Sequence, residues 1–195
     1  GARGYVVALD DWILPVLISG ALLVLLWQGR LRWLGVVPVC IALLAWPQSQ
    51  RPQVLIAADG GLIGVMTQDG RALSRARGKS FVAGIWLEND GDGVDQERAF
   101  ARGQGDSSAR VQTFEWQGRR FIHVIGKTGL AQLKATCLRE EVIVLTVAAD
   151  RPEGGCDWLT PARLRASGSI AYFDGGKMIA AHQRSPRLWS PHLTK

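Results

Sequence analysis

Positively charged side chains gather at two places in the chain. The first cluster is Arg71, Arg75, Arg77 and Lys79, and the second is Arg119 and Arg120. Guanidinium and ammonium groups neutralise phosphates, and aromatic rings such as Phe114 and Trp116, near the second cluster, can stack on unpaired bases. The pattern therefore predicts weak binding of single-stranded DNA, with a solvated basic surface as the alternative.

Histidines and acidic residues form no recognisable metal motif. The three histidines, His123, His182 and His192, lack HxH, HxxH or HExxH spacing, and the acidic loop 89–95 lacks the bidentate Glu of an EF-hand. We expect no cofactor, no metal site and no catalytic residue. The alternative is a divergent metal-dependent hydrolase or nuclease. Its ligands would be Asp59, Asp90, Asp92 and His123.

The chain has three cysteines, too few for a disulfide scaffold. Cys40 lies in an apolar run, where it can serve as a small apolar residue. Cys137 lies at the end of a predicted helix and Cys156 lies just beyond a predicted strand, so the chain could bring them together. In an oxidising compartment they would form a disulfide, and two unpaired thiols are the alternative.

The elements that must position these residues fall into two parts. Residues 12–29 and 33–50 are uncharged apolar runs with tryptophans at their ends, which predicts a transmembrane helical hairpin within domain 1–50. Arg30 and Arg32 in the connector place it in the cytoplasm by the positive-inside rule. The sequence thus predicts a multi-pass protein of the bacterial inner membrane, with residues 51–195 in the periplasm. It also predicts that the chain is the C-terminal end of a longer protein.

Residues 51–195 carry +5 of the formal net charge of +6 and show the pattern of a mixed α/β (α+β) domain. Asp-Gly turns bracket a strand at 62–67, and the uninterrupted run 142–147 predicts a strand that is covered on both faces. Further strands are expected at 71–74, 111–116, 120–125, 169–173 and 177–181, and helices at 81–88, 129–139 and 162–167, with a loop at 89–108.

Several segments in order resemble the C-terminal end of ComEC-type DNA internalisation (competence) proteins, in their alphaproteobacterial form. The segments are GRLRWLG, RPQVLIAADGGLIGV, DGRALSRARG, FVAGIWLENDGD, LRASGSIAYFDGG and RLWSP, and they cover most of residues 28–191 except about 93–110. The resemblance implies an inner-membrane channel that admits one DNA strand during natural transformation. Many relatives end in a metallo-β-lactamase-like domain with an HxHxDH motif. This chain lacks that motif, so no nuclease ligand is carried over.

The expected protein is therefore a membrane helical hairpin followed by a mixed α/β domain, for which a degenerate metallo-β-lactamase-like form is one option. The expected function is DNA handling without catalysis at the end of a DNA uptake channel. The expected partners are membrane lipid, single-stranded DNA, the remaining transmembrane part of the same protein and other, unidentified competence proteins. The alternatives are the divergent hydrolase and a structural assembly domain.

Overall fold

The computed structural model describes residues 10–48, 51–103, 105–133 and 136–181. The chain divides into two compact units. The first comprises residues 1–51 with 88–92, and the second comprises 52–87 with 93–195. Two of the three histidines considered as metal ligands, His182 and His192, lie outside the described residues, as does the RLWSP segment.

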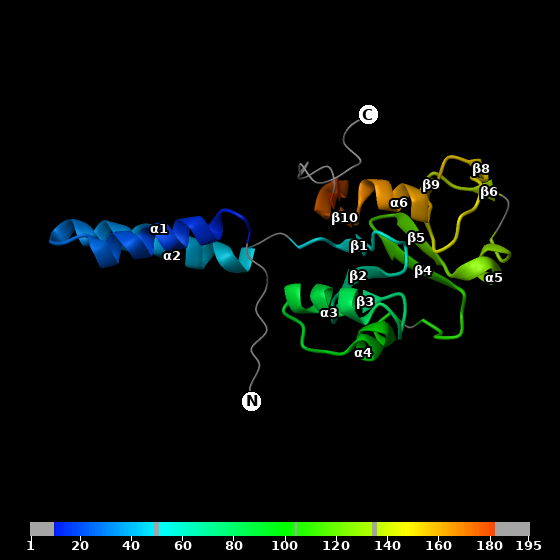
Figure 1. Cartoon of the computed structure of the whole chain (residues 1–195), viewed down its shortest axis with the longest axis horizontal. Helices are drawn as coiled ribbons and strands as arrows, with labels where there is room; N and C mark the ends of the chain where they lie inside the picture. The colour runs from blue at the N-terminus through cyan, green and yellow to red at the C-terminus, as the bar shows by residue number, and fades with distance from the viewer. Residues whose placement is uncertain (1–9, 49–50, 104, 134–135, 182–195) are drawn as a thin grey trace. The chain divides into compact units, whose positions relative to one another are not determined.

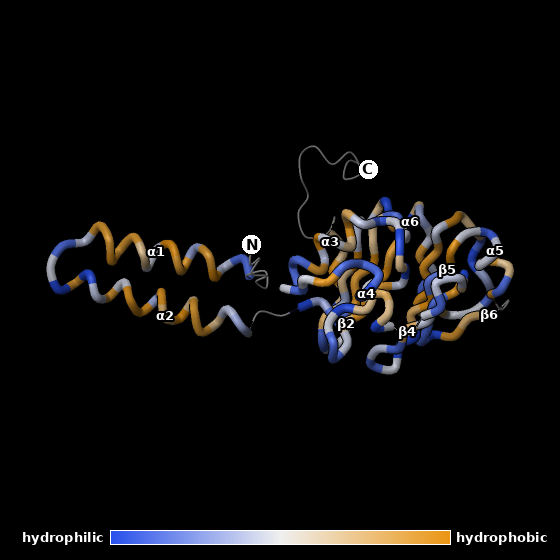
Figure 2. The backbone as a smooth tube through the Cα atoms, turned by 90° about the horizontal axis from the view of Figure 1, so that it is seen from below, coloured by the Kyte–Doolittle hydropathy of each residue, from blue (hydrophilic) through white to orange (hydrophobic). Residues whose placement is uncertain are grey.

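The first unit is built from two short apolar helices. Its elements are α1 (Ile13–Leu26), the 3-10 turn η1 (Arg30–Gly35), α2 (Val36–Ala45) and the 3-10 turn η2 (Trp46–Gln48). Gly20 allows α1 to lie close to the end of η1, because a Cβ atom at this position would be only 2.8 Å from the carbonyl oxygen of Gly35. Apolar residues dominate both helices (Figure 2).

These helices correct the prediction of a transmembrane hairpin. The helix α1 has 14 residues and α2 has 10, so they span about 21 Å and about 15 Å at 1.5 Å per residue. Among the described residues, no helix is both long enough and apolar enough to cross a bilayer. The predicted spans 12–29 and 33–50 were too long because Trp27–Gly29 and the 3-10 turn η1 interrupt the helical backbone. The predicted inner-membrane localisation, on which the periplasmic placement rested, is therefore also wrong.

The second unit contains two larger sheets (Figure 1). The first sheet is antiparallel throughout, with the strand order β11-β10-β1-β2-β3. Its strands are β1 (Val54–Ile56), β2 (Ile63–Thr67), β3 (Gly70–Leu73), β10 (Ile170–Tyr172) and β11 (Met178–Ala180).

The second sheet is mixed, with the order β4-β5-β7-β9. Its strands are β4 (Val111–Trp116), β5 (Arg119–Val124), β7 (Glu141–Leu145) and β9 (Asp157–Leu159). The strand β4 runs antiparallel to β5, whereas β7 pairs in parallel with both β5 and β9. All five residues of β7 are buried, which confirms the strand predicted from the apolar run 142–147. A two-stranded sheet joins β6 (Thr136–Cys137) to β8 (Glu153–Gly154).

Three apolar clusters hold the second unit together. The central cluster lies between the two larger sheets and combines Val54, Ile56, Ile63 and Val65 of the first with Phe121, Val142, Val144 and Leu159 of the second. On the other face of the first sheet pack α3 (Ser80–Asn89) and α4 (Gln96–Ala101), through residues such as Leu87 and Ala99. On the other face of the second sheet, Ile122, Ile143 and Trp158 pack with Cys137 and Cys156. The second unit is therefore an α/β fold with one antiparallel and one mixed larger sheet. The predicted fold class was wrong in placing a membrane helical hairpin before it.

Local signals predicted some helices and missed others. The helix α6 (Pro161–Ser167) begins as predicted, with the Thr160 side chain accepting a hydrogen bond from Arg163 N at 3.3 Å. The expected helix 129–139 is wrong, because α5 covers only Gly126–Leu130 and Cys137 joins a strand that pairs with β8. The expected loop 89–108 contains α4, whose N-cap Asp95 accepts a hydrogen bond from Arg98 N at 2.8 Å.

Candidate functional site

The loop 74–79 between β3 and α3 carries three of the four residues in the first basic cluster. Ser74 anchors its start, because the buried Ser74 hydroxyl accepts a hydrogen bond from Ile63 N at 2.9 Å. The side chain of Gln96 on α4 holds its middle by donating to the carbonyl oxygens of Arg75 at 3.0 Å and Gly78 at 2.7 Å. Gly78 and Lys79 both have positive φ, which turns the chain into α3.

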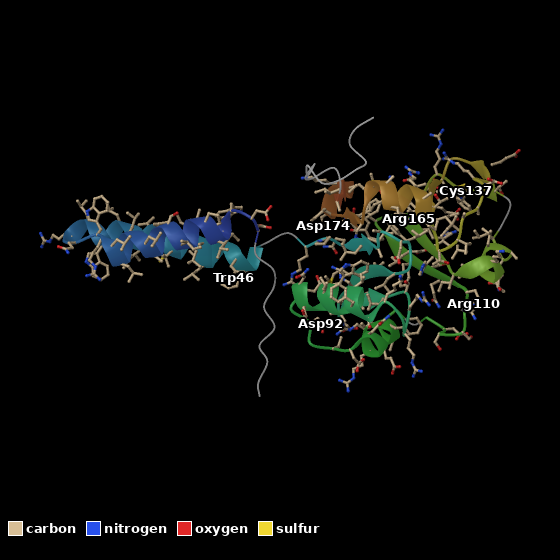
Figure 3. The ribbon with its side chains drawn as sticks, viewed as in Figure 1. Trp46, Asp92, Arg110, Cys137, Arg165 and Asp174 are labelled. Carbon is tan, nitrogen blue, oxygen red and sulfur yellow. A yellow bond between two sulfur atoms is a disulfide. The ribbon has the colours of Figure 1, made fainter. Side chains whose placement is uncertain are left out.

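This loop borders a pocket of about 670 Å³. Arg75 and Arg77 line it from the loop, Glu97 and Phe100 from α4, and Arg110 from the residue before β4. Figure 3 labels Arg110. Two segments far apart in the sequence thus bring three guanidinium groups to one pocket, and Glu97 is the sole carboxylate among its described lining residues.

The three arginines of the pocket differ in their partners. Arg77 Nε lies 2.6 Å from Glu97 Oε1, and the side chains are 85% and 59% exposed. Neither Arg75 nor Arg110 has an ion-pair partner within the described ranges. The pocket thus carries two guanidinium groups without a carboxylate partner, and a third that is paired at the surface.

Arg71, predicted with this cluster, is a core residue and does not reach the pocket. Its side chain is fully buried, and its Nη2 donates to the carbonyl oxygen of Pro52 at 3.0 Å. The side chain also fills the space above Gly64, where a Cβ atom would lie 2.7 Å from Arg71 Cδ. Because it is shielded from solvent, Arg71 is not placed to contact a phosphate, contrary to the sequence prediction.

Lys79 is committed to a neighbour on the β1–β2 loop. Its Nζ donates to Asp59 Oδ2, and Gly61 N donates to the other carboxylate oxygen at 2.9 Å. Burial by itself would raise the pKa of Asp59, but the hydrogen bonds from Lys79 and Gly61 and the Lys79 charge outweigh it, so this pKa is lowered. Lys79 therefore adds less free positive charge to the surface than its place in the sequence indicates.

The second predicted cluster is separate from the pocket and balanced by carboxylates. Arg119 Nη1 lies 3.8 Å from Asp157, and Arg120 Nη1 lies 3.2 Å from Glu141. Arg120 Nε is also 3.7 Å from Glu115. Because each guanidinium group has a carboxylate partner, this cluster offers little unbalanced charge to a phosphate.

His123 lies behind the pocket, on β5. In the β4–β5 ladder it pairs with Gln112, which lines the pocket. Its side chain is fully buried, its Nε2 lies 2.9 Å from the Gly60 carbonyl oxygen, and no group in the described part of the chain bonds to its Nδ1. Burial lowers the pKa of His123 to about 4, and the nearby positive charge of Arg75 also lowers it. The hydrogen bond to Gly60 raises this pKa, but by less. At neutral pH the uncharged ring therefore donates from Nε2 to Gly60.

The ligand set of the hydrolase alternative is not assembled. Within the described ranges, no three His, Cys, Asp or Glu side chains come together in a way that could hold a metal ion. Asp59 is held by Lys79 and Gly61, and His123 has no exposed surface with which to touch a substrate. This geometry gives no support to Asp59, Asp90, Asp92 and His123 as a metal centre.

The structure joins Cys137 to Cys156 in a disulfide, with an S–S distance of 2.04 Å and Cα atoms 5.5 Å apart. The bridge fixes β6 beside the segment that leads into β9, on the face of the second sheet where Ile122, Ile143 and Trp158 pack. Figure 3 labels Cys137. Cys40 on α2 is a free, exposed cysteine.

Sequence reasoning missed Arg110 and Glu97. Arg110 stands by itself after the acidic loop, and no local pattern connects it to residues 75–77. One local signal for the helix that carries Glu97 was present in the sequence. Asp95 stands directly before the segment QERAFA, where it is a typical N-cap residue for a short helix. No protein-family model, no curated protein and no solved structure matches this chain, so the resemblance to the DNA internalisation family and the lactamase-like form gain no support from relatives.

Proposed function

We propose that residues 52–181 bind single-stranded nucleic acid through the pocket formed by Arg75, Arg77 and Arg110, without cleaving it. The observation that carries this proposal is the convergence of three guanidinium groups, from the β3–α3 loop and from the residue before β4, on one pocket whose described lining has a single carboxylate. Guanidinium groups bind phosphate oxygens strongly, and a pocket of about 670 Å³ is within the usual range for ligand sites.

Charge dominates this site, so its binding should be weak and independent of base sequence. Phe100, the aromatic residue in the lining, is only 7% exposed and offers little surface on which a base could stack. Each phosphate neutralised on a single strand contributes about −0.7 to the slope of log K against log salt. Two or three phosphate contacts therefore predict a slope between about −1.4 and −2.1.

Fluorescence anisotropy with the purified full-length chain and a labelled oligothymidine tests this proposal. Replacing Arg75, Arg77 and Arg110 together by Ser should bring the slope close to zero, whereas replacing them by Lys should preserve most of the binding, because charge is kept.

The matched control replaces Arg139, Arg165 and Lys177 by Ser, which removes the same number of positive charges. Arg139 lies between β6 and β7, and Arg165 lies on α6 (Figure 3 labels Arg165). Lys177 lies between η3 (Asp174–Gly176) and β11, the strand at the opposite edge of the first sheet from β3. None of the three lines the pocket. This control should bind like the natural chain. Equal losses in both triple variants would show that net charge, rather than the pocket, attracts the strand. No binding at low salt would favour the structural assembly domain instead.

A further inference from the structure

We infer that Glu97 is a built-in competitor for the strand, occupying Arg77 until a phosphate displaces it. This inference deepens the proposed function and rests on it. Arg77 Nε and Glu97 Oε1 lie 2.6 Å apart at the edge of the pocket, and the described part of the chain gives Arg77 no other carboxylate.

The fold positions Glu97 for this contact. Asp95 caps α4, and Gln96 ties the first turn of this helix to the backbone of the 74–79 loop through the Arg75 and Gly78 carbonyl oxygens. Glu97 therefore faces a loop whose backbone is held to its own helix. The carboxylate stands where a phosphate oxygen would have to bind if it were to use Arg77.

The exposure of this ion pair makes the displacement easy. Both side chains are more than half exposed, and such surface pairs are worth little in water. A strand that carries several phosphates can therefore displace Glu97, whereas Arg75 and Arg110 meet the first phosphates without a competitor. The pocket thus has two arginines that are ready to bind and one whose use depends on releasing Glu97.

The inference predicts a change in salt dependence. Because the pair formed by Arg77 and Glu97 is electrically neutral, it adds little to the net positive charge that the strand meets, so Arg77 contributes almost nothing to the slope while Glu97 is present. The natural chain should then show a slope of about −1.4 from Arg75 and Arg110. Removing the competitor in Glu97→Gln should steepen the slope to about −2.1 and raise the affinity up to about fivefold at low salt.

Two further variants separate this effect from a general loss of negative charge. Asp69→Asn removes an exposed carboxylate from the β2–β3 turn, where Asn-Gly suits a hairpin equally well, and it should leave the slope unchanged. Adding Arg77→Gln to Glu97→Gln should return the slope to about −1.4, because the newly freed guanidinium group is then absent.

These outcomes distinguish the inference from the function on which it rests. If the natural chain binds the oligothymidine but Glu97→Gln has the same slope, Glu97 is not a competitor and the proposed function stands. If neither the natural chain nor Glu97→Gln binds at low salt, the proposed function fails. A steeper slope in Asp69→Asn as well would assign the effect to the overall charge and overturn the inference.

Discussion

At the scale of single residues, the basic cluster 71–79 divides according to what surrounds each charged group. Arg71 is enclosed by the fold, Lys79 is held by Asp59, and Arg75 and Arg77 reach the pocket. In the sequence these residues look alike, because spacing reports neither the depth of a side chain nor its partner. Their surroundings thus determine whether they stabilise the fold or attract a ligand.

The buried arginine should be important for stability. Arg71→Ala removes a side chain that fills the space above Gly64 and bonds to the Pro52 carbonyl, so we expect it to lower the free energy of unfolding by about 2–4 kcal/mol. Arg77→Ala, at an 85% exposed side chain, should change it by less than about 0.5 kcal/mol. Urea denaturation of both variants provides the test, and equal stabilities would contradict the assignment of Arg71 to the core.

His123 should make the fold sensitive to mild acid. Its pKa is lowered to about 4 in the folded chain, from an ordinary 6.5, so the unfolded chain takes up the proton first as the pH falls below 6.5. The folded state should therefore lose about 2 kcal/mol between pH 7.5 and pH 5 through this group.

The matched variant for this prediction is His123→Gln, which keeps a neutral donor for Gly60 and cannot titrate. Urea denaturation at both pH values should show a smaller loss for this variant than for the natural chain, and the difference should be about 2 kcal/mol. If the two proteins lose the same free energy, His123 is not the group that confers acid sensitivity.

At the scale of elements, a sequence predicts best where one local signal dominates. The uninterrupted run of apolar and β-branched residues at 142–147 is typical of a strand buried on both faces, and Thr160-Pro161 is a strong helix start, so β7 and α6 were predicted correctly. The expected helix at 129–139 failed because the partners of Cys137, namely Cys156 and the strand β8, come from a segment about twenty residues further on. The pocket escaped prediction for the same reason, since Arg110 meets Arg75 only through the tertiary fold.

The disulfide should stabilise the second unit without affecting the proposed site. Cys137 and Cys156 are separated by 19 residues, and a loop of this size corresponds to about 3 kcal/mol in the chain-entropy estimate. We expect the double Ser variant to lose about this much in urea denaturation and still to bind the oligothymidine, because neither cysteine lines the pocket. Cys40→Ser is the control and should leave stability almost unchanged, since Cys40 is free and exposed. Loss of strand binding in a folded double variant would contradict the separation of the two features.

At the scale of the whole molecule, the positively charged side chains differ in whether they have a carboxylate partner. The formal net charge is +6, yet Arg119, Arg120 and Lys79 each have a carboxylate partner. Within the described ranges, Arg75 and Arg110 have no carboxylate partner, and both line the same pocket. Composition gives the sign of the net charge, but which cations remain without a carboxylate partner depends on how the fold pairs them.

The arrangement of the His, Cys, Asp and Glu side chains leads us to expect that the chain binds a strand without cutting it. A metal-dependent nuclease needs several ligands at one point, and the described part of the chain gathers no three candidate side chains. We expect a labelled single strand to remain intact after incubation with the full-length chain and Mn²⁺ or Zn²⁺. We also expect EDTA to change neither the melting temperature of the protein nor the affinity of the protein for the strand. Cleavage that EDTA abolishes and that His123→Gln removes would establish the hydrolase alternative. Persistence of that cleavage in His123→Gln would place the metal ligands elsewhere in the chain.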